Sequence, residues 1–285
     1  MTITNPLQAR PIVPSSSLGK LASIWRDISM LIFRNLVHIA RDPGQLSDVM
    51  IEPVVFTLLF VSIFGAAVTT AGGYNYRQFA IAGMILLCII TSSMGTAVGV
   101  SSDLNTGVID RFRTLPMWPA AVLVARSITD ILSSMLCVAI VILTGLAIGW
   151  RPEASLLSIV GGIALILLFG YALSWGWICL GLIAKNPEST QGIGLIIVIP
   201  LALVSNVLVS TQEMKPAWLQ TIANWNPVSA IASACRQLFG NPNPSSAINA
   251  WPMQHPVWAA LIWSIGLLII FFPTGAYLYR RRTMK

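Results

Sequence analysis

Six continuous apolar runs constrain this chain more than any other feature of its sequence. They cover about 53–71, 78–100, 120–149, 156–184, 190–210 and 256–279. A helix needs around 20 apolar residues to cross a hydrocarbon core roughly 30 Å thick, and six runs meet that requirement. The runs are continuously apolar rather than alternating, which favours helices over a membrane barrel. The sequence therefore predicts an all-α integral membrane protein with six transmembrane helices.

The few charged residues, 9% of the chain, predict its orientation. Twelve Lys and Arg residues fall on the side that carries both termini and the connector 101–118, whereas four fall on the opposite side. Because Lys and Arg are retained on the inner side, we expect both termini inside a bacterial-type cytoplasmic membrane. The net charge of +7 follows from this topology. No nucleic-acid binding is expected, since basic and aromatic residues are not interleaved on a soluble face.

Residues 20–41 form the pattern of an amphipathic helix after a flexible segment, 1–19. Apolar residues recur at steps of three and four, and cations occupy the other side. Such a helix is expected along the inner membrane surface. Two roles remain open at this point: a membrane anchor, or a grip on a cytoplasmic partner. The stretch "RDPGQL" is expected to end this helix, and Pro53 to open the first span.

The segment 211–255 is the longest connector on the outer side. Its sequence predicts two amphipathic helices separated by Asn226-Pro227, each too short to span a membrane. Four tryptophans lie along this region, and tryptophan favours the headgroup level, so half-inserted re-entrant helices are favoured over an ordinary interfacial loop. Trp118 and Trp150, which bracket the third run, are expected to be interface anchors.

No enzymatic site is expected on this chain. The two histidines, His38 and His255, fall on opposite sides of the membrane in the predicted topology, which excludes a His-centred triad or zinc cluster. The chain has no G-x-x-x-x-G-K-[ST] stretch and so no P-loop for ATP. Cysteines within the runs are expected to be small buried side chains without a disulfide framework.

Ionisable residues within or next to the runs are few. Arg126 and Asp130 lie four residues apart at the start of the third run, and we expect a structural ion pair rather than a proton relay. Glu52 is expected at the inner mouth of the first span, as a gate residue or an end-cap. With no carboxylate or histidine expected near the midplane, energy for any transport must come from elsewhere.

The connector 101–118, "SSDLNTGVIDRFRTLPMW", concentrates charge on the inner side. Its apolar stripe at helical spacing consists of Val108, Ile109, Phe112 and Leu115. The charged residues beside this stripe are Asp103, Asp110, Arg111 and Arg113. Such charges can fix the register of a protein contact. From the residues alone, a docking surface and a solvated loop remain equally open.

Five stretches resemble permeases of the ABC-2 exporter superfamily, most closely the daunorubicin-resistance type. They are "RDPGQLSDVMIEPVVFTLLFVSIFG" (41–65), "AVGVSSDLNTGVIDRFRTLPM" (97–117), "ARSITDILSSML" (125–136), "LFGYALSWGWICLGLIAKNPESTQG" (168–192) and "MKPAWLQTIANWNPVSAIASACRQL" (214–238). The D-R-F-R-x-L-P-M stretch is the most specific, and the resemblance runs from about residue 26 to the C-terminus. It implies one ABC-2 transmembrane domain, 20–285, acting as a non-enzymatic half-transporter.

The resemblance implies that two permease subunits, identical or paralogous, work with two ATP-binding subunits. ATP and Mg would be bound by those partners, and this chain would hold no cofactor. The implied coupling residues are Asp103, Gly107, Asp110, Arg111, Phe112, Arg113, Leu115 and Pro116. The implied connecting helix carries Trp25, Arg26, Arg34 and Arg41.

The resemblance also implies an ATP-driven exporter that alternates between inward- and outward-facing states. Wall residues of its path, by family analogy, are Phe56, Phe60, Phe64, Met84 and Asn206. The scarcity of buried charge favours amphipathic or lipophilic cargo, drug-like or lipid. Two alternatives remain: a permease for a polysaccharide, glycolipid or lipid-linked product, and a membrane scaffold without transport.

Overall fold

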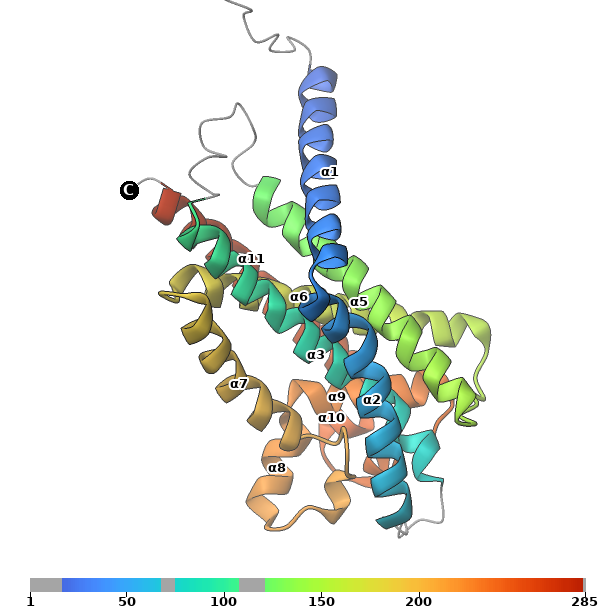
Figure 1. The fold of residues 1–285 in the computed structure, drawn as a ribbon. Helices are drawn as coiled ribbons and strands as arrows, with labels where there is room; N and C mark the ends of the chain where they lie inside the picture. Colours follow the sequence, from blue (N-terminus) through green and yellow to red (C-terminus); the bar gives the residue numbers. More distant parts are fainter. Residues whose placement is uncertain (1–16, 68–74, 108–120, 284–285) are drawn as a thin grey trace, which may run out of the picture.

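The computed structural model describes residues 17–67, 75–107 and 121–283, and these ranges contain helices and no strand. The long helices are α1 (Ser17–Arg41), α2 (Pro43–Ala67), α3 (Tyr76–Asn105), α5 (Ala121–Ala147), α6 (Leu156–Ile183), α7 (Pro187–Leu203) and α11 (Pro256–Thr283). Between α7 and α11 lie η1 (Thr211–Glu213), α8 (Ala217–Trp225), α9 (Pro227–Phe239), η2 (Pro244–Ala247) and α10 (Trp251–Gln254). Figure 1 shows their arrangement, which confirms the predicted all-α class.

Among the described residues, four helices are long and apolar enough to cross a membrane: α3, α5, α6 and α11. They correspond to the second, third, fourth and sixth predicted runs. The first and fifth runs correspond to shorter apolar stretches, Val49–Gly65 in α2 and Pro187–Leu203 in α7. Helices suit these sequences because a backbone in hydrocarbon must make its hydrogen bonds within the segment. The count of six spans stays a prediction.

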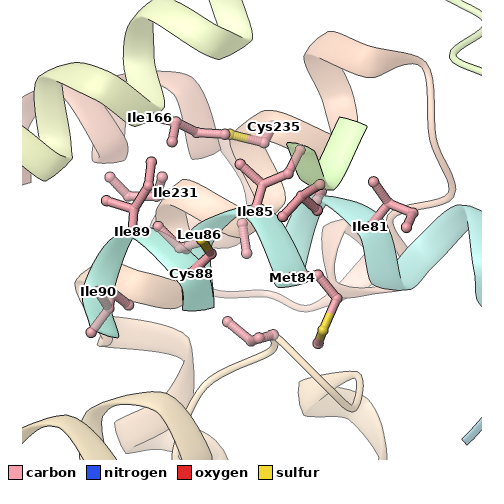
Figure 2. Close-up of a cluster of buried hydrophobic side chains, with 14 of the residues drawn as sticks. Ile81, Met84, Ile85, Leu86, Cys88, Ile89, Ile90, Ile166, Ile231 and Cys235 are labelled. Atoms are coloured by element: carbon pink, nitrogen blue, oxygen red, sulfur yellow. The ribbon is translucent and has the colours of Figure 1, made fainter. Parts of the chain in front are cut away.

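The core of the bundle is built on α3, which packs against α2, α5, α6, α7 and α9. A helix that is apolar on every side is stable only when neighbours surround it, and nearly every residue from Phe79 to Ile90 is buried. Figure 2 shows Ile85 and Ile89 of α3 beside Ile166 of α6 and Ile231 of α9. The position of the other helices therefore follows from their contact with α3.

Glycines allow backbones to approach closely at several helix contacts. A Cβ on Gly83 of α3 would overlap the carbonyl of Val207, and one on Gly181 of α6 would overlap the carbonyl of Ala97. Small residues at such contacts are typical of helix packing in membranes, where tight packing replaces the hydrophobic driving force. These two glycines thus bring α3 against both the segment after α7 and α6.

A single residue, Asp42, separates α1 from α2, so the predicted end of the first helix is confirmed. The Asp42 carboxylate accepts a hydrogen bond from the Gly44 N–H (3.0 Å), and Pro43 occupies the first position of α2. The expectation that Pro53 opens the first span is wrong, because Pro53 lies inside α2. Pro43 begins the helix instead, and α2 continues past Pro53 without the hydrogen bond that a proline cannot donate.

The predicted break at Asn226-Pro227 is confirmed. Asn226 ends α8 and caps α9: its side chain accepts a hydrogen bond from the Val228 N–H (2.9 Å) and donates one to the Leu201 carbonyl (2.9 Å). Trp150, expected as an interface anchor, is instead buried against Phe239 of α9, with ring centroids 5.8 Å apart. Insertion of α8 and α9 into a membrane stays a prediction.

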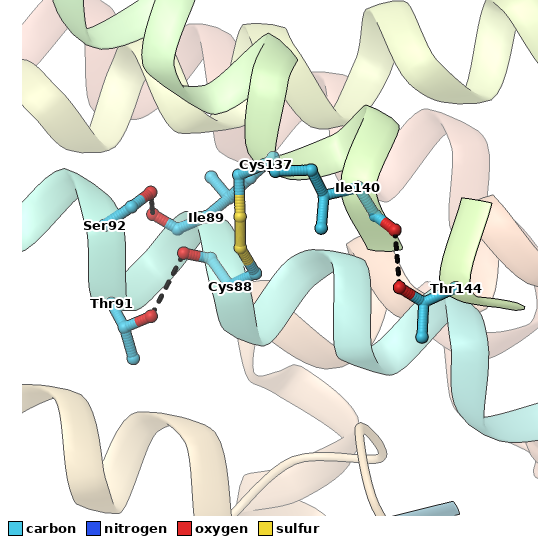
Figure 3. Close-up of a disulfide and its surroundings, with 7 residues drawn as sticks. All are labelled: Cys88, Ile89, Thr91, Ser92, Cys137, Ile140 and Thr144. Carbon is cyan, nitrogen blue, oxygen red and sulfur yellow. Dashed lines mark hydrogen bonds between the residues drawn. A yellow bond between two sulfur atoms is a disulfide. The ribbon is translucent and has the colours of Figure 1, made fainter. Parts of the chain in front are cut away.

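Cys88 of α3 and Cys137 of α5 form a disulfide, shown in Figure 3, with their Cα atoms 6.8 Å apart. The expectation that no disulfide forms was wrong. The 49-residue separation of the two cysteines gives no pairing signal in the sequence. They meet because α3 and α5 pack side by side.

The contact at Gly83 generates a prediction about stability. We expect Gly83→Ala to lower the free energy of unfolding by about 1 to 3 kcal/mol, because the added methyl group overpacks the contact with Val207. The matched control is Gly95→Ala in the same helix, where a Cβ would meet nothing within 4 Å. That control should be neutral or stabilising, since alanine favours helix over glycine by about 1 kcal/mol. Thermal unfolding in detergent measures both, and equal melting temperatures would contradict this packing.

Candidate functional site

The two ends of the bundle differ in composition. At one end α3 stops, α5 starts and α11 reaches its last residues, and we call it the connector end (Figure 1). At the other end lie α8, α9 and α10, and we call it the short-helix end (Figure 1). Two of the sequence-predicted coupling residues, Asp103 and Gly107, lie at the connector end together with Arg126, whereas the predicted path residues lie along α2, α3 and the segment after α7.

An ion pair joins α3 to α5 at the connector end. Arg126 Nη1 donates a hydrogen bond to Asp103 Oδ2 at 2.8 Å. Both side chains are about one-fifth exposed, at 22% for Arg126 and 19% for Asp103. Asp103 lies in the last turn of α3 and Arg126 in the second turn of α5. The pair therefore joins α3, which precedes the segment 106–120, to α5, which follows it.

Gly99 provides the space for this ion pair. A Cβ at Gly99 would overlap the guanidinium group of Arg126. Gly99 lies one helical turn before Asp103, so the arginine side chain crosses α3 at the glycine and reaches the carboxylate beyond it. Gly99 and Asp103, four residues apart on α3, thus form one contact site for Arg126 of the neighbouring helix.

Asp130, the predicted partner of Arg126, binds elsewhere. Its Oδ1 accepts a hydrogen bond from the Thr96 hydroxyl of α3 at 2.8 Å, and its side chain is buried. The predicted direct pair between Arg126 and Asp130 is therefore replaced by two contacts to α3. Spacing along α5 puts both residues on one face, and that face packs against α3, which supplies a closer partner to each.

The helix α1 also contacts this junction. Ile28 and Leu31 are buried against Ala121 and Ala125 of α5. Toward the end of α1, the Asn35 amide donates to the Thr129 hydroxyl of α5 at 3.5 Å. We define Asn35, Thr96, Gly99, Asp103, Arg126, Thr129 and Asp130 as the junction cluster. It connects three helices, α1, α3 and α5, at one end of the bundle.

Arg34 of α1 adds a second cation beside this cluster. Its guanidinium donates to the Asn35 side chain (3.0 Å), and it lies close enough to Arg126 for the two positive charges to repel. Asp103 and Asp130 both attract Arg126 in the same place. The junction thus combines two cations from different helices with two carboxylates.

The remaining predicted inner residues are placed as follows. Trp25, Arg26 and Arg41 are exposed on α1, with Trp25 66% exposed. Gly107, just beyond α3, has a φ of 67°, a left-handed conformation that favours glycine. The other predicted coupling residues, Asp110, Arg111, Phe112, Arg113, Leu115 and Pro116, lie outside the described residues.

A cleft between α2 and α3 brings together two of the predicted path residues. Its cavity volume is about 10 Å³, roughly the space of one water molecule. Its lining residues are Glu52, Pro53, Phe56, Thr57, Met84, Leu87, Cys88 and Thr91. Phe56 of α2 and Met84 of α3 therefore line the same cleft, and their role in a substrate path stays a prediction.

Aromatic rings extend from this cleft toward the short-helix end. The ring centroids of Phe56 and Phe60 are 6.0 Å apart, and those of Phe60 and Phe64 are 5.7 Å apart. The row continues to Tyr76 of α3, 6.2 Å from Phe64, and to Phe79. All three predicted phenylalanines thus belong to one row on α2, with Phe60 and Phe64 packed against the core.

Asn206, the last predicted path residue, is fully buried near the end of this row. Its side-chain amide donates a hydrogen bond to the Ser233 hydroxyl of α9 (2.6 Å), and its backbone carbonyl accepts one from the Arg236 guanidinium (2.7 Å). Arg236 is also buried, lies 3.6 Å from the centroid of the Phe79 ring and donates to the Phe79 carbonyl. The structure therefore gives Asn206 a packing position between helices.

Sequence reasoning missed several members of these sites. Thr96 and Asn35 look like ordinary helical polar residues, and Arg236 was counted only as a charge in an outer connector. The useful signal was their rarity: a polar residue inside an apolar run requires a partner. The identity of that partner depends on helix packing. Among the described residues, no group of three or more His, Cys, Asp or Glu side chains could hold a metal ion.

The fold and its two sites define a helical integral membrane protein with a charged junction at one end and an apolar cleft within the bundle. Residues 26–239 match the family of ABC-2 type transporters. The chain belongs to the ABC-2 type transporter family.

Curated relatives cover nearly the whole chain. The chain is 31% identical to the daunorubicin resistance ABC transporter permease protein DrrB1 of Streptomyces coeruleorubidus, over 96% of this chain and 90% of the relative. It is 24% identical to a putative transport permease, ycf38, of Porphyra purpurea, over 90% of this chain and 88% of the relative. It is 22% identical to the doxorubicin resistance ABC transporter permease protein DrrB of Mycobacterium tuberculosis, over 84% of each.

The Asp103–Arg126 contact generates a prediction about coupling energy. In a double-mutant cycle of Asp103→Asn and Arg126→Met, we expect a coupling free energy of about 1 to 2 kcal/mol, because the pair is charged, hydrogen-bonded and largely buried. The control cycle pairs Asp103→Asn with Arg77→Met at the opposite end of α3, and its coupling should be close to zero. Unfolding free energies in detergent give both values. Equal coupling in the two cycles would contradict the ion pair.

Proposed function

We propose that this chain is the permease subunit of an ATP-driven exporter that moves amphipathic or lipophilic small molecules outward. Membership of the ABC-2 family and the names of its relatives support this function. A working unit would contain two permease subunits, identical or paralogous, and two separate ATP-binding subunits on the cytoplasmic side. ATP and Mg would be held by those partners, and this chain would have no catalytic site of its own.

The observation that carries the proposal is the junction cluster. A partner that pushes on the segment 106–120 acts on two helices at once, because Arg126 and Asp103 join the end of α3 to the start of α5. The contacts of α1 with α5 place a third helix under the same force. Since packed helices move as discrete units rather than deform continuously, a displacement here can shift whole helices.

The direction of that movement suits alternating access. The end of α3 that receives the force continues along the helix to Met84 and the cleft against α2. A rotation or shift of α3 relative to α2 would change the width of this cleft. The conformational energy would come from ATP binding to the partner, and the permease would convert it into a change of access for its cargo.

The connector 106–120 is the proposed contact with the ATP-binding subunit. We expect Arg111→Glu and Asp110→Lys each to weaken co-purification of that subunit at least about tenfold, because a reversed charge brings like charges together across the contact. The matched control is Lys215→Glu, an exposed charge reversal at the short-helix end. Association that is indifferent to both connector variants would rule out this contact, whereas loss in the control would indicate misfolding.

The proposed orientation can be tested by cysteine labelling in intact cells. We expect Gln212→Cys, exposed at the short-helix end, to react with a membrane-impermeant maleimide, and Lys285→Cys to react only after permeabilisation. The native Cys235 should contribute little background, because burial raises the pKa of its thiol and keeps it protonated. The opposite labelling pattern would place the C-terminus outside and the short-helix end inside, and it would contradict the proposed orientation.

Transport itself is tested by reconstituting the chain with its ATP-binding subunit in vesicles. With the ATP-binding subunit facing outward, ATP should drive an amphipathic fluorescent dye into the lumen, and a non-hydrolysable nucleotide should not. A polysaccharide permease would need a wide continuous channel, and the small α2–α3 cleft favours small cargo instead. Absence of ATP-dependent dye movement with an intact complex would overturn the proposed function.

A further inference from the structure

The last turns of α6 and α11 meet at the connector end and leave a groove between them. Its cavity volume is about 290 Å³, far more than the single-water space between α2 and α3. Its lining residues are Leu182, Ile183, Leu278, Arg281 and Arg282. Each helix has 28 residues and is therefore roughly 40 Å long, longer than a hydrocarbon core of roughly 30 Å. We therefore expect the groove at the level of the lipid headgroups.

The inner wall of this groove is fixed by the core. Leu182 is buried in a cluster that also contains Val100 of α3 and Leu123 of α5, and Leu278 packs against the same cluster. Ile183, the last residue of α6, is exposed and forms the outer rim. The groove thus combines a packed apolar wall with an apolar rim that faces outward.

Two arginines provide the charge of the groove. The Arg282 guanidinium donates a hydrogen bond to the Ile183 carbonyl at 3.4 Å, which holds this cation at the end of α6. Such a contact is typical of a cation near a helix C-terminus, and it uses one of the five N–H groups of the guanidinium. Arg281 is adjacent to it. Among the lining residues that the structure describes, none is Asp or Glu, so the groove is cationic.

An exposed apolar stripe on α11 continues from the groove toward the middle of the helix. Ile270, Tyr277 and Arg281 follow one another at steps of seven and four residues, which places them on one helix face. Ile270 is 60% exposed and Tyr277 is 62% exposed. Tyrosine is enriched at the interface between membrane and water. The face therefore changes from isoleucine to tyrosine to arginine along α11, in the order of acyl chain, interface and headgroup.

This order favours a lipid over a water-soluble partner as the occupant. Eleven residues separate Ile270 from Arg281, or roughly 16 Å along the helix axis. A partner bound from the aqueous side would meet the arginines but would leave the stripe below them uncovered. A phospholipid has a charged end and an apolar tail, and it covers both.

We propose that this groove binds an anionic phospholipid, whose phosphate contacts Arg281 and Arg282 and whose acyl chain lies against Ile183 and Leu278. The planar guanidinium matches the geometry of phosphate oxygens. Basic pockets between membrane helices are typical sites for anionic headgroups. The bound lipid would join the last turn of α6 to that of α11. The site goes beyond the proposed export function and does not depend on it.

Two fluorescent lipids that differ in headgroup charge test this site directly. They are phosphatidylglycerol and phosphatidylcholine with the same fluorophore on the same acyl chain, and fluorescence anisotropy measures their binding to the purified chain in neutral detergent. The wild type should bind phosphatidylglycerol at least about tenfold more tightly, because each of the two arginines contributes about fivefold near an anionic headgroup. Combined Arg281→Gln and Arg282→Gln should reduce this preference to within about threefold.

Two further variants separate lipid binding from helix capping. Arg281→Gln alone leaves the Arg282 contact with Ile183 in place, and it should lose part of the preference. Combined Arg281→Lys and Arg282→Lys keeps both charges and should retain part of it. If the lysine variant lost the preference as fully as the glutamine variant and melted at a lower temperature without lipid, the arginines would have a structural role and the site would be overturned.

The matched control removes the same charge at the short-helix end, with Arg77→Gln and Lys215→Gln, which are both exposed. It should leave the preference intact. A wild type without preference, a double-glutamine variant that keeps it, or an equal loss in the control would overturn the proposal. Displacement of the lipid by inorganic phosphate at constant ionic strength would make this a free-phosphate site instead. Loss of the ATP-binding subunit from the double-glutamine variant with an unchanged lipid preference would assign the groove to that protein.

Discussion

The burial of α3 on every side is the constraint on which the rest of this structure depends. Apolar residues surround this helix, so neighbours must cover all of its faces. In a membrane the lipid could do this, but glycines at 83 and 99 bring protein backbone or an arginine side chain closer than any lipid chain could fit. The result is a central helix held at one end by the segment after α7, along its length by α6, and at the other end by Arg126.

This arrangement makes α3 a mechanical link between the junction cluster and the cleft. Its last turns carry Asp103, which is bonded to α5, and its middle carries Met84 and Thr91 on the cleft wall. A helix transmits displacement along its axis because each turn is hydrogen-bonded to the next. The short-helix end resists that displacement, since Arg236 binds the Phe79 carbonyl at the start of α3. Force applied at the connector end would therefore act on a helix whose far end is anchored.

The sequence predicts the long elements well and their contacts poorly, for a physical reason. Continuous apolar runs identify α3, α5, α6 and α11, because hydrophobic length alone selects a membrane helix. The Asn226-Pro227 break also has a local signal, since asparagine caps and proline starts a helix. The partners of Arg126 and Cys88 have no such signal. Local spacing favours Asp130 for Arg126, yet the helix that packs across α5 supplies Asp103 at hydrogen-bond distance.

Two buried charged residues of the interior help to determine how the helices pack. Asp130 and Arg236 are buried, and their hydrogen bonds to neighbouring helices compensate for the loss of water. Such groups specify which helices pack together, and the core closes over them.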